Sequence, residues 1–196
     1  MRLALQHLKK DPILGEIIRN HGKFTIEYRD PVFETLVRSI VYQQLSGRVA
    51  SVIFGRLRDA VGGKITPEAI LKLRPQQMRK LGLSGQKTLY IRELSKHTKK
   101  GTVVFEGLSR MDDNAVIEHL TQVKGIGVWT AHMFLIFALR RPDVLPTGDL
   151  GVRTAIQKAW KLDELPKPQE MEKIAAKWRP WASVASWYLW RSLDNE

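Results

Sequence analysis

Signals that begin α-helices recur along the whole chain and constrain its fold more than any other feature. A capping side chain stands before a proline suited to the first helical turn at three places, Asp11-Pro12, Asp30-Pro31 and Thr66-Pro67. Apolar residues then follow a helical period of about 3.6 residues, most clearly in the stripe Phe33, Leu36, Val37, Ile40 and Val41. Only residues 23–28 and 102–105 resemble strands in composition. The sequence therefore predicts an all-α protein.

Further helices are expected from the same periodicity and from the prolines and glycines that interrupt it. They are expected near residues 49–61, 67–73, 75–81, 85–99, 112–121, 129–139, 150–160, 169–177 and 181–193. The segment 129–139 is apolar on nearly every side, which indicates a buried central helix.

The charge balance favours a polyanionic partner. The chain has 196 residues, and its 32 lysines and arginines against 20 aspartates and glutamates give a net charge of +12. Such a field attracts nucleic acid or an anionic membrane surface, although a merely solvated basic surface has the same composition. The absence of cysteine excludes disulfides and thiolate chemistry. Because no run of about 18 apolar residues and no signal-peptide pattern occurs, we expect an intracellular protein, cytoplasmic in a prokaryote or nuclear in a eukaryote.

A short glycine-bearing turn, residues 123–129, joins two of the expected helices. Gly125 and Gly127 permit positive φ and the close approach of another molecule, and the following helix N-terminus offers unpaired N–H groups. Together these features are typical of a phosphate site, although many turns of this kind only connect two helices.

Asp149 lies where an irregular segment meets the helix expected at residues 150–160. An aspartate at such a position most often caps the helix. A carboxylate beside a helix N-terminus is also favoured in its ionised form, and on a loop it can face a cleft. Capping and catalysis are compatible, so both interpretations stay open.

The break at residues 42–47 carries two glutamines and Leu45 between two helices. A DNA-binding interpretation uses Leu45 as an apolar wedge and the amides as hydrogen-bonding probes. The alternative is a plain helix end, with surface amides and Leu45 packed inward.

Six tryptophans occur in the chain, and four of them follow residue 177. With Trp129 and Tyr42, these side chains could build an aromatic pocket. Most aromatic stripes are core, and we expect Trp181 and Trp187 to be mainly that.

Taken together, these segments resemble the helix-hairpin-helix DNA glycosylase superfamily, in its 3-methyladenine DNA glycosylase II branch. The resemblance spans roughly residues 31–193. It is carried by residues 123–131 and by Leu145-Pro146-Thr147-Gly148-Asp149, and it is supported by residues 42–46 and 178–190. It implies two helical lobes with a DNA-binding cleft between them. Residues 31–139 would form the lobe with the hairpin, and residues 1–30 with 140–196 the lobe carrying Asp149.

The resemblance also implies roles for single residues. Asp149 matches the catalytic aspartate, and Leu45 matches the residue that fills the gap left by a flipped nucleotide. The positions that match the base pocket are Tyr42, Trp129, Met133 and Trp190. The residues expected to contact DNA are Gln44, Leu45, Ser46, Lys124, Gly125 and Gly127. The backbone carbonyls of Thr121, Val123 and Ile126 match those that hold Na⁺ or K⁺ beside a DNA phosphate.

Two departures from the superfamily's pattern narrow the expected chemistry. Bifunctional members carry a lysine nucleophile where this chain has Trp129, so no lyase activity is expected. Members with an iron–sulfur cluster use four cysteines near the C-terminus, and this chain has none. No cofactor is therefore expected to be required.

The implied function is a monofunctional DNA glycosylase, the first enzyme of base excision repair. It would flip alkylated purines of the 3-methyladenine and 7-methylguanine type out of double-stranded DNA and hydrolyse their N-glycosidic bond. We expect it to act as a monomer and not to bind a membrane. Aromatic pocket walls would hold a cationic base by stacking and cation–π attraction. Two alternatives are a non-catalytic helix-hairpin-helix DNA-binding module and a glycosylase of the same fold acting on mismatched or oxidised bases.

Overall fold

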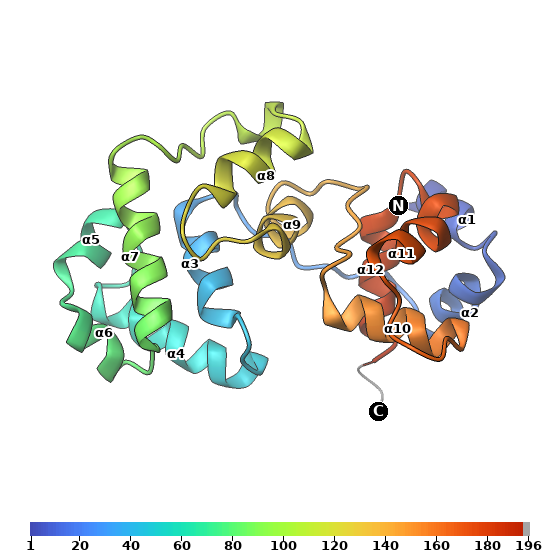
Figure 1. Cartoon of the computed structure of the whole chain (residues 1–196), viewed down its shortest axis with the longest axis horizontal. Coiled ribbons are helices and arrows are strands. Elements are labelled where there is room, and N and C mark those ends of the chain that lie inside the picture. Colours follow the sequence, from blue (N-terminus) through green and yellow to red (C-terminus); the bar gives the residue numbers. More distant parts are fainter. Residues whose placement is uncertain (194–196) are drawn as a thin grey trace. The chain divides into compact units, whose positions relative to one another are not determined.

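The computed structural model describes residues 1–193, and all regular secondary structure in this range is helical (Figure 1). The prediction of an all-α fold is thus confirmed, and the two strand-like segments join no sheet within these residues. The chain divides into two compact units. One comprises Arg29–Leu139, and the other comprises Met1–Tyr28 with the chain from Arg140 onward. None of the helices in residues 1–193 combines the length and apolarity needed to cross a bilayer.

The Arg29–Leu139 unit is built around α3, whose buried stripe is the one predicted from the sequence. Leu36, Val37, Ile40 and Val41 are completely buried, and α3 packs against α4, α7 and α9. The helices of this unit are α3 (Phe33–Tyr42), α4 (Gly47–Ala60), α5 (Pro67–Lys72), α6 (Pro75–Lys80), α7 (Gly85–Lys99), α8 (Asp113–Thr121) and α9 (Val128–Phe137), with a 3₁₀ turn at Leu108–Arg110.

Helix α9 is buried along most of its length, as its composition predicts, but its first residue is not. Ala131, Phe134 and Leu135 are in the core, whereas Val128 is 53% exposed. The apolar side chain of Val128 is therefore available at the surface beside the Gly125–Gly127 turn.

The prediction that Asp30 caps a helix beginning at Pro31 is wrong. Helix α3 begins at Phe33 with Val32 as its N-cap residue, and no side chain caps it. The Val32 N–H bonds to the Asp30 carbonyl, and that carbonyl also accepts from the Thr35 hydroxyl. Asp30 thus serves this helix end through its backbone. The other two capping predictions are confirmed: Asp11 accepts from the first turn of α2, and Thr66 accepts from the Ala69 N–H.

The second unit joins the two ends of the chain. Its helices are α1 (Arg2–Leu8), α2 (Pro12–His21), α10 (Leu150–Trp160), α11 (Pro168–Ala175) and α12 (Ala182–Arg191), with a 3₁₀ turn at Ala176–Trp178. Helix α12 packs against α2 and α10, and its residues Ala182–Leu189 are all buried.

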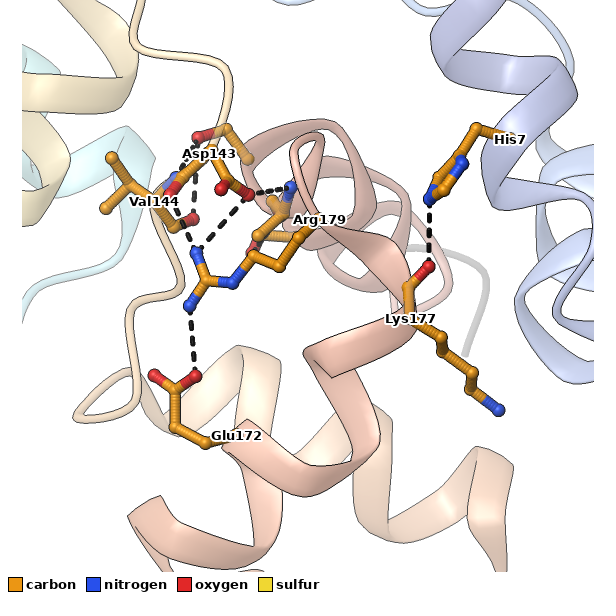
Figure 2. Close-up of polar contacts among 9 residues, drawn as sticks. His7, Asp143, Val144, Glu172, Lys177 and Arg179 are labelled. Carbon is orange, nitrogen blue, oxygen red and sulfur yellow. Dashed lines mark hydrogen bonds and ion pairs between the residues drawn. The ribbon is translucent and has the colours of Figure 1, made fainter.

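Polar contacts between distant segments fasten the N-terminal helices within this unit. Asp11 is 4% exposed. Its carboxylate accepts from the indole of Trp178 (2.9 Å) and forms an ion pair with the Lys177 ammonium (3.1 Å). His7 Nε2 hydrogen-bonds the Lys177 carbonyl at 2.9 Å (Figure 2). Because Asp11 also caps α2, one buried carboxylate stabilises both the start of a helix and its tertiary packing.

Candidate DNA-binding and catalytic site

The hairpin, residues 123–129, comprises the tight turn between α8 and α9 and the first two residues of α9. The Ile126 N–H donates to the Val123 carbonyl at 3.0 Å, and Gly125 has a φ of +97°. A Cβ at Gly125 would lie 2.0 Å from Cγ of Tyr90, so glycine is required both for the backbone conformation and for the space. Gly127, the N-cap residue of α9, supplies no side-chain cap to the N–H groups of the first turn. These features fit a surface that receives a phosphate oxygen.

We define the wedge loop as residues 43–46, between α3 and α4. Leu45 is 37% exposed, so its side chain is not packed inward as a plain helix end would require. Gln44 has a φ of 55°, an uncommon value for a residue with a side chain. Gln43, in contrast, points back into its own unit and donates to the hairpin and to Thr130 in the first turn of α9. The exposed residues of this loop are therefore 44–46.

An apolar cavity of about 190 Å³ lies within the Arg29–Leu139 unit. Three of the four residues predicted for the base pocket, Tyr42, Trp129 and Met133, line it together with Phe137. The fourth, Trp190, belongs to the other unit, where its indole has a specific polar partner.

Arg38 also lines this cavity, and sequence reasoning missed it. Its guanidinium carbon lies 3.9 Å from the centre of the Tyr42 ring and 5.4 Å from that of Phe54. Arg38 precedes Tyr42 by one helical turn, and that spacing in the sequence was the available signal. One face of Tyr42 is therefore already covered by a cation, and Trp129 and Phe137 supply the other aromatic rings that line the cavity.

Asp149 caps α10 and makes a second contact that no local pattern shows. Its Oδ1 accepts from the Val152 N–H and from the Trp190 indole N–H, each at 2.8 Å. The residue is 8% exposed. Two donors that converge on one oxygen fix the orientation of the carboxylate. Gly151 makes room for this arrangement, since a Cβ there would lie 3.1 Å from Asp149 Oδ1 and 3.0 Å from Trp190 Cδ1.

The segment that leads to Asp149 is attached to the start of α12. The Val144 N–H donates to the Ser183 hydroxyl at 2.9 Å, and the Ser183 N–H donates to the Pro142 carbonyl at 3.0 Å. Because Asp149 contacts Trp190 near the other end of α12, this one helix holds both ends of the segment. Neither Ser183 nor its partners carry a sequence signal for this role.

Arg179 strengthens the same attachment (Figure 2). Its guanidinium donates to the Asp143 carbonyl at 2.8 Å and to the Glu172 carboxylate at 2.9 Å, and it lies 3.3 Å from the Asp143 carboxylate. Partial burial opposes the charge of Arg179, but the hydrogen bond to Glu172 and the attraction of Asp143 outweigh burial and raise its pKa. The Asp143 carboxylate in turn accepts from the Ala182 N–H at 3.1 Å.

The histidine and acidic side chains of residues 1–193 do not cluster into a metal site. No group of three or more histidine, cysteine, aspartate or glutamate side chains that could hold an ion occurs in that range. At the hairpin, the Val123 carbonyl already accepts one hydrogen bond from within the turn, which leaves it a second lone pair. Uncharged carbonyls of this kind suit a monovalent cation better than a transition metal.

The fold and the hairpin place the chain in a class of DNA repair proteins. Residues 37–180 match the HhH-GPD superfamily of base excision DNA repair proteins, and the chain belongs to this family. The match includes the wedge loop, the hairpin and Asp149.

Two relatives and one solved structure are similar to the chain over most of its length. The chain is 32% identical to a putative DNA-3-methyladenine glycosylase of Bacillus subtilis, over 97% of this chain and 69% of the relative. It is 34% identical to DNA-3-methyladenine glycosylase 1 of Schizosaccharomyces pombe, over 86% and 75%. The solved structure of a 3-methyladenine DNA glycosylase of S. pombe, in complex with abasic DNA, superposes with a TM-score of 0.90 at 32% identity and covers 98% of both chains.

Proposed function

We propose that the protein is a DNA-3-methyladenine glycosylase with Asp149 as its catalytic carboxylate. It hydrolyses the N-glycosidic bond of alkylated purines in double-stranded DNA, the first step of base excision repair. The observation that carries the proposal is the arrangement at Asp149, whose Oδ1 is held by the Val152 N–H and the Trp190 indole. The relatives named above share the family and the fold.

Base extrusion comes before chemistry, since water cannot reach the glycosidic bond of a stacked base. The hairpin anchors the phosphate backbone through N–H groups at the start of α9, without reading sequence. The exposed Leu45 fills the gap that the extruded nucleotide leaves. We further propose that the carbonyls of Thr121, Val123 and Ile126 hold Na⁺ or K⁺ beside the same phosphate.

Bond cleavage requires a leaving group and support for positive charge on the sugar. A 3-methyladenine or 7-methylguanine base already carries positive charge, so it departs with the bonding electrons without needing a general acid. The Asp149 carboxylate stabilises the oxocarbenium-like transition state and orients the water that attacks the anomeric carbon. This explains how one carboxylate suffices where ordinary glycosidases use two.

The residue at the start of α9 favours hydrolysis without strand cleavage. Where bifunctional members of the superfamily carry a lysine nucleophile, this chain has Trp129, whose ring lines the apolar cavity. The reaction should therefore form no Schiff base. Trapping with borohydride tests this directly, and a covalent enzyme–DNA adduct would contradict it.

The decisive experiment replaces Asp149 by asparagine. Asparagine caps a helix as well as aspartate does, so the fold should be retained while the negative charge is lost. We expect single-turnover excision from methylated duplex DNA to fall by about 10²- to 10³-fold, with affinity for abasic DNA unchanged. Asp163→Asn, an exposed change in the same unit, is the matched control. Undiminished excision by the Asp149→Asn variant would show that Asp149 is not the catalytic carboxylate.

The alternative of a different lesion class is tested by the products. Alkylated genomic DNA and DNA with oxidised or mismatched bases are incubated with the protein, and the released bases are identified by mass spectrometry. Methylpurines in the released fraction support the proposal. Release of oxidised or mismatched bases alone favours the alternative, and release of none favours a non-catalytic DNA-binding module.

A further inference from the structure

Gln43 connects the two parts of the molecule that the proposed function assigns to DNA. It is the first residue after α3 and opens the wedge loop. Its side-chain amide nitrogen donates to the Gly125 carbonyl at 3.1 Å and to the Thr130 hydroxyl at 3.2 Å. The amide group has two hydrogens, so one can bind the hairpin turn while the other binds the first turn of α9.

We propose that Gln43 is a positioning residue that couples the hairpin to the wedge loop. Seating of a DNA phosphate on the hairpin and insertion of Leu45 would then occur as one rigid movement. The proposal rests on the proposed function for its consequence in DNA. Its structural part, the rigidity of residues 43–46, is a property of the protein without DNA and does not depend on the proposed function.

The partners of Gln43 are themselves firmly held. Thr130 is 1% exposed, and Gly125 lies against the ring of Tyr90 so closely that no Cβ would fit. On the other side, the Lys87 ammonium donates to the Val41 carbonyl at 2.7 Å, in the last turn of α3. Partial burial lowers the pKa of Lys87. The wedge loop therefore starts from a helix end that α7 fixes and is tied to a hairpin that the same helix supports.

The backbone just beyond Gln43 needs such support. Gln44 has a left-handed φ of 55°, and a residue with a side chain keeps this conformation only where its surroundings impose it. Leu45 follows with 37% of its surface exposed. Without the two hydrogen bonds of Gln43, the loop can relax and Leu45 loses its fixed direction.

This role predicts a characteristic defect. Leu45 acts on the extrusion of the base, whereas phosphate contacts set affinity for undamaged duplex. Loss of the two hydrogen bonds of Gln43 should slow excision of a well-paired lesion. It should have less effect on a lesion in a mismatch, because a mispaired base is extruded more easily. A residue that acted in bond cleavage would lower both rates equally.

The experiment compares Gln43→Ala with Gln76→Ala, an exposed glutamine on α6 outside the proposed site. For Gln43→Ala we expect excision of a paired lesion to fall about 10- to 30-fold, because two hydrogen bonds are lost. Excision of a mispaired lesion should fall less than about 5-fold. Fluorescence of 2-aminopurine beside the lesion should show slower extrusion. Affinity for undamaged duplex and its salt dependence should not change.

A second variant keeps the test independent of any folding defect. Thr130→Val removes one of the two acceptors with little change of shape, and it should show a smaller defect of the same kind. In the double variant the two losses should not add, since both remove the same contact. Fully additive losses would overturn the coupling.

Hydrogen exchange of the free protein tests, without DNA, whether the hydrogen bonds of Gln43 make the wedge loop rigid. Amides of residues 43–46 should exchange faster in Gln43→Ala than in the wild type and in Gln76→Ala. Unchanged exchange, or an equal loss on paired and mispaired lesions, would overturn the proposal. If wild-type protein released no alkylated base but the exchange difference appeared, the proposed function would fail and the structural coupling would stand.

Discussion

Gly151→Ala adds a single methyl group beside the hydrogen bond that orients the catalytic carboxylate. Gly151 lies in the first turn of α10, two residues after Asp149. The new Cβ would lie 3.0 Å from Trp190 Cδ1, 3.3 Å from Trp190 Nε1 and 3.1 Å from Asp149 Oδ1. These atoms flank a hydrogen bond of 2.8 Å, so the methyl group presses on both of its partners.

The magnitude follows from how far the neighbours must move. Contacts of 3.0–3.1 Å are tighter than nine in ten real Cβ contacts, so Trp190 or Asp149 must shift by a few tenths of an ångström. A misplacement of about 1 Å in an active site costs about 10²-fold in rate, which scales here to roughly 10-fold. Stability should change little, since alanine favours a helix by about 1 kcal/mol and overpacking costs about 1–3 kcal/mol.

Single-turnover excision and thermal unfolding measure the two effects separately. We expect about a 10-fold slower reaction for Gly151→Ala, unchanged affinity for abasic DNA and a melting temperature within a few degrees of the wild type. Gly55→Ala is the matched control, because Gly55 lies inside α4 with nothing within 4 Å of the added Cβ. It should stabilise the protein by about 1 kcal/mol and leave excision unchanged. Wild-type excision by Gly151→Ala would refute the claim that the Trp190 contact positions Asp149.

Two further substitutions separate positioning from contact with the base. Trp190→Phe removes the indole donor but keeps an aromatic ring, and it should slow excision by about 10- to 100-fold, the loss of a hydrogen bond to a charged group. The factor should be the same for every alkylated base in competition assays, whereas a factor that varies with the base would indicate stacking on the lesion. Leu45→Ala should slow excision of paired lesions about 10-fold and of mispaired lesions much less, with abasic-DNA affinity as the second measurement. Equal losses on the two substrates would contradict the wedge role.

The sequence alone determined those features that depend on near neighbours along the chain. The caps at Asp11, Thr66 and Asp149 bond to backbone N–H groups two to three residues away, so residue type and local order suffice to predict them. The apolar stripe of α3 and the glycine turn before α9 are equally local. The wrong capping prediction at Asp30 shows the limit of such local reasoning, because the Asp30 carbonyl and not its side chain accepts a hydrogen bond from the first turn of α3.

The tertiary structure decided which side chains meet across long intervals of sequence. Trp190 contacts Asp149 over 41 residues, and Gln43 contacts Gly125 over 82. The resemblance matched Trp190 to a base-pocket position, and the DNA-binding interpretation used the amide of Gln43 as a probe. The structure adds what neither showed, a polar partner for each side chain inside its own unit. A tryptophan or glutamine has the same local preferences whether it faces a ligand or an internal acceptor. Only the packing of helices decides which acceptor lies within hydrogen-bonding distance, because that distance depends on residues far away in the chain.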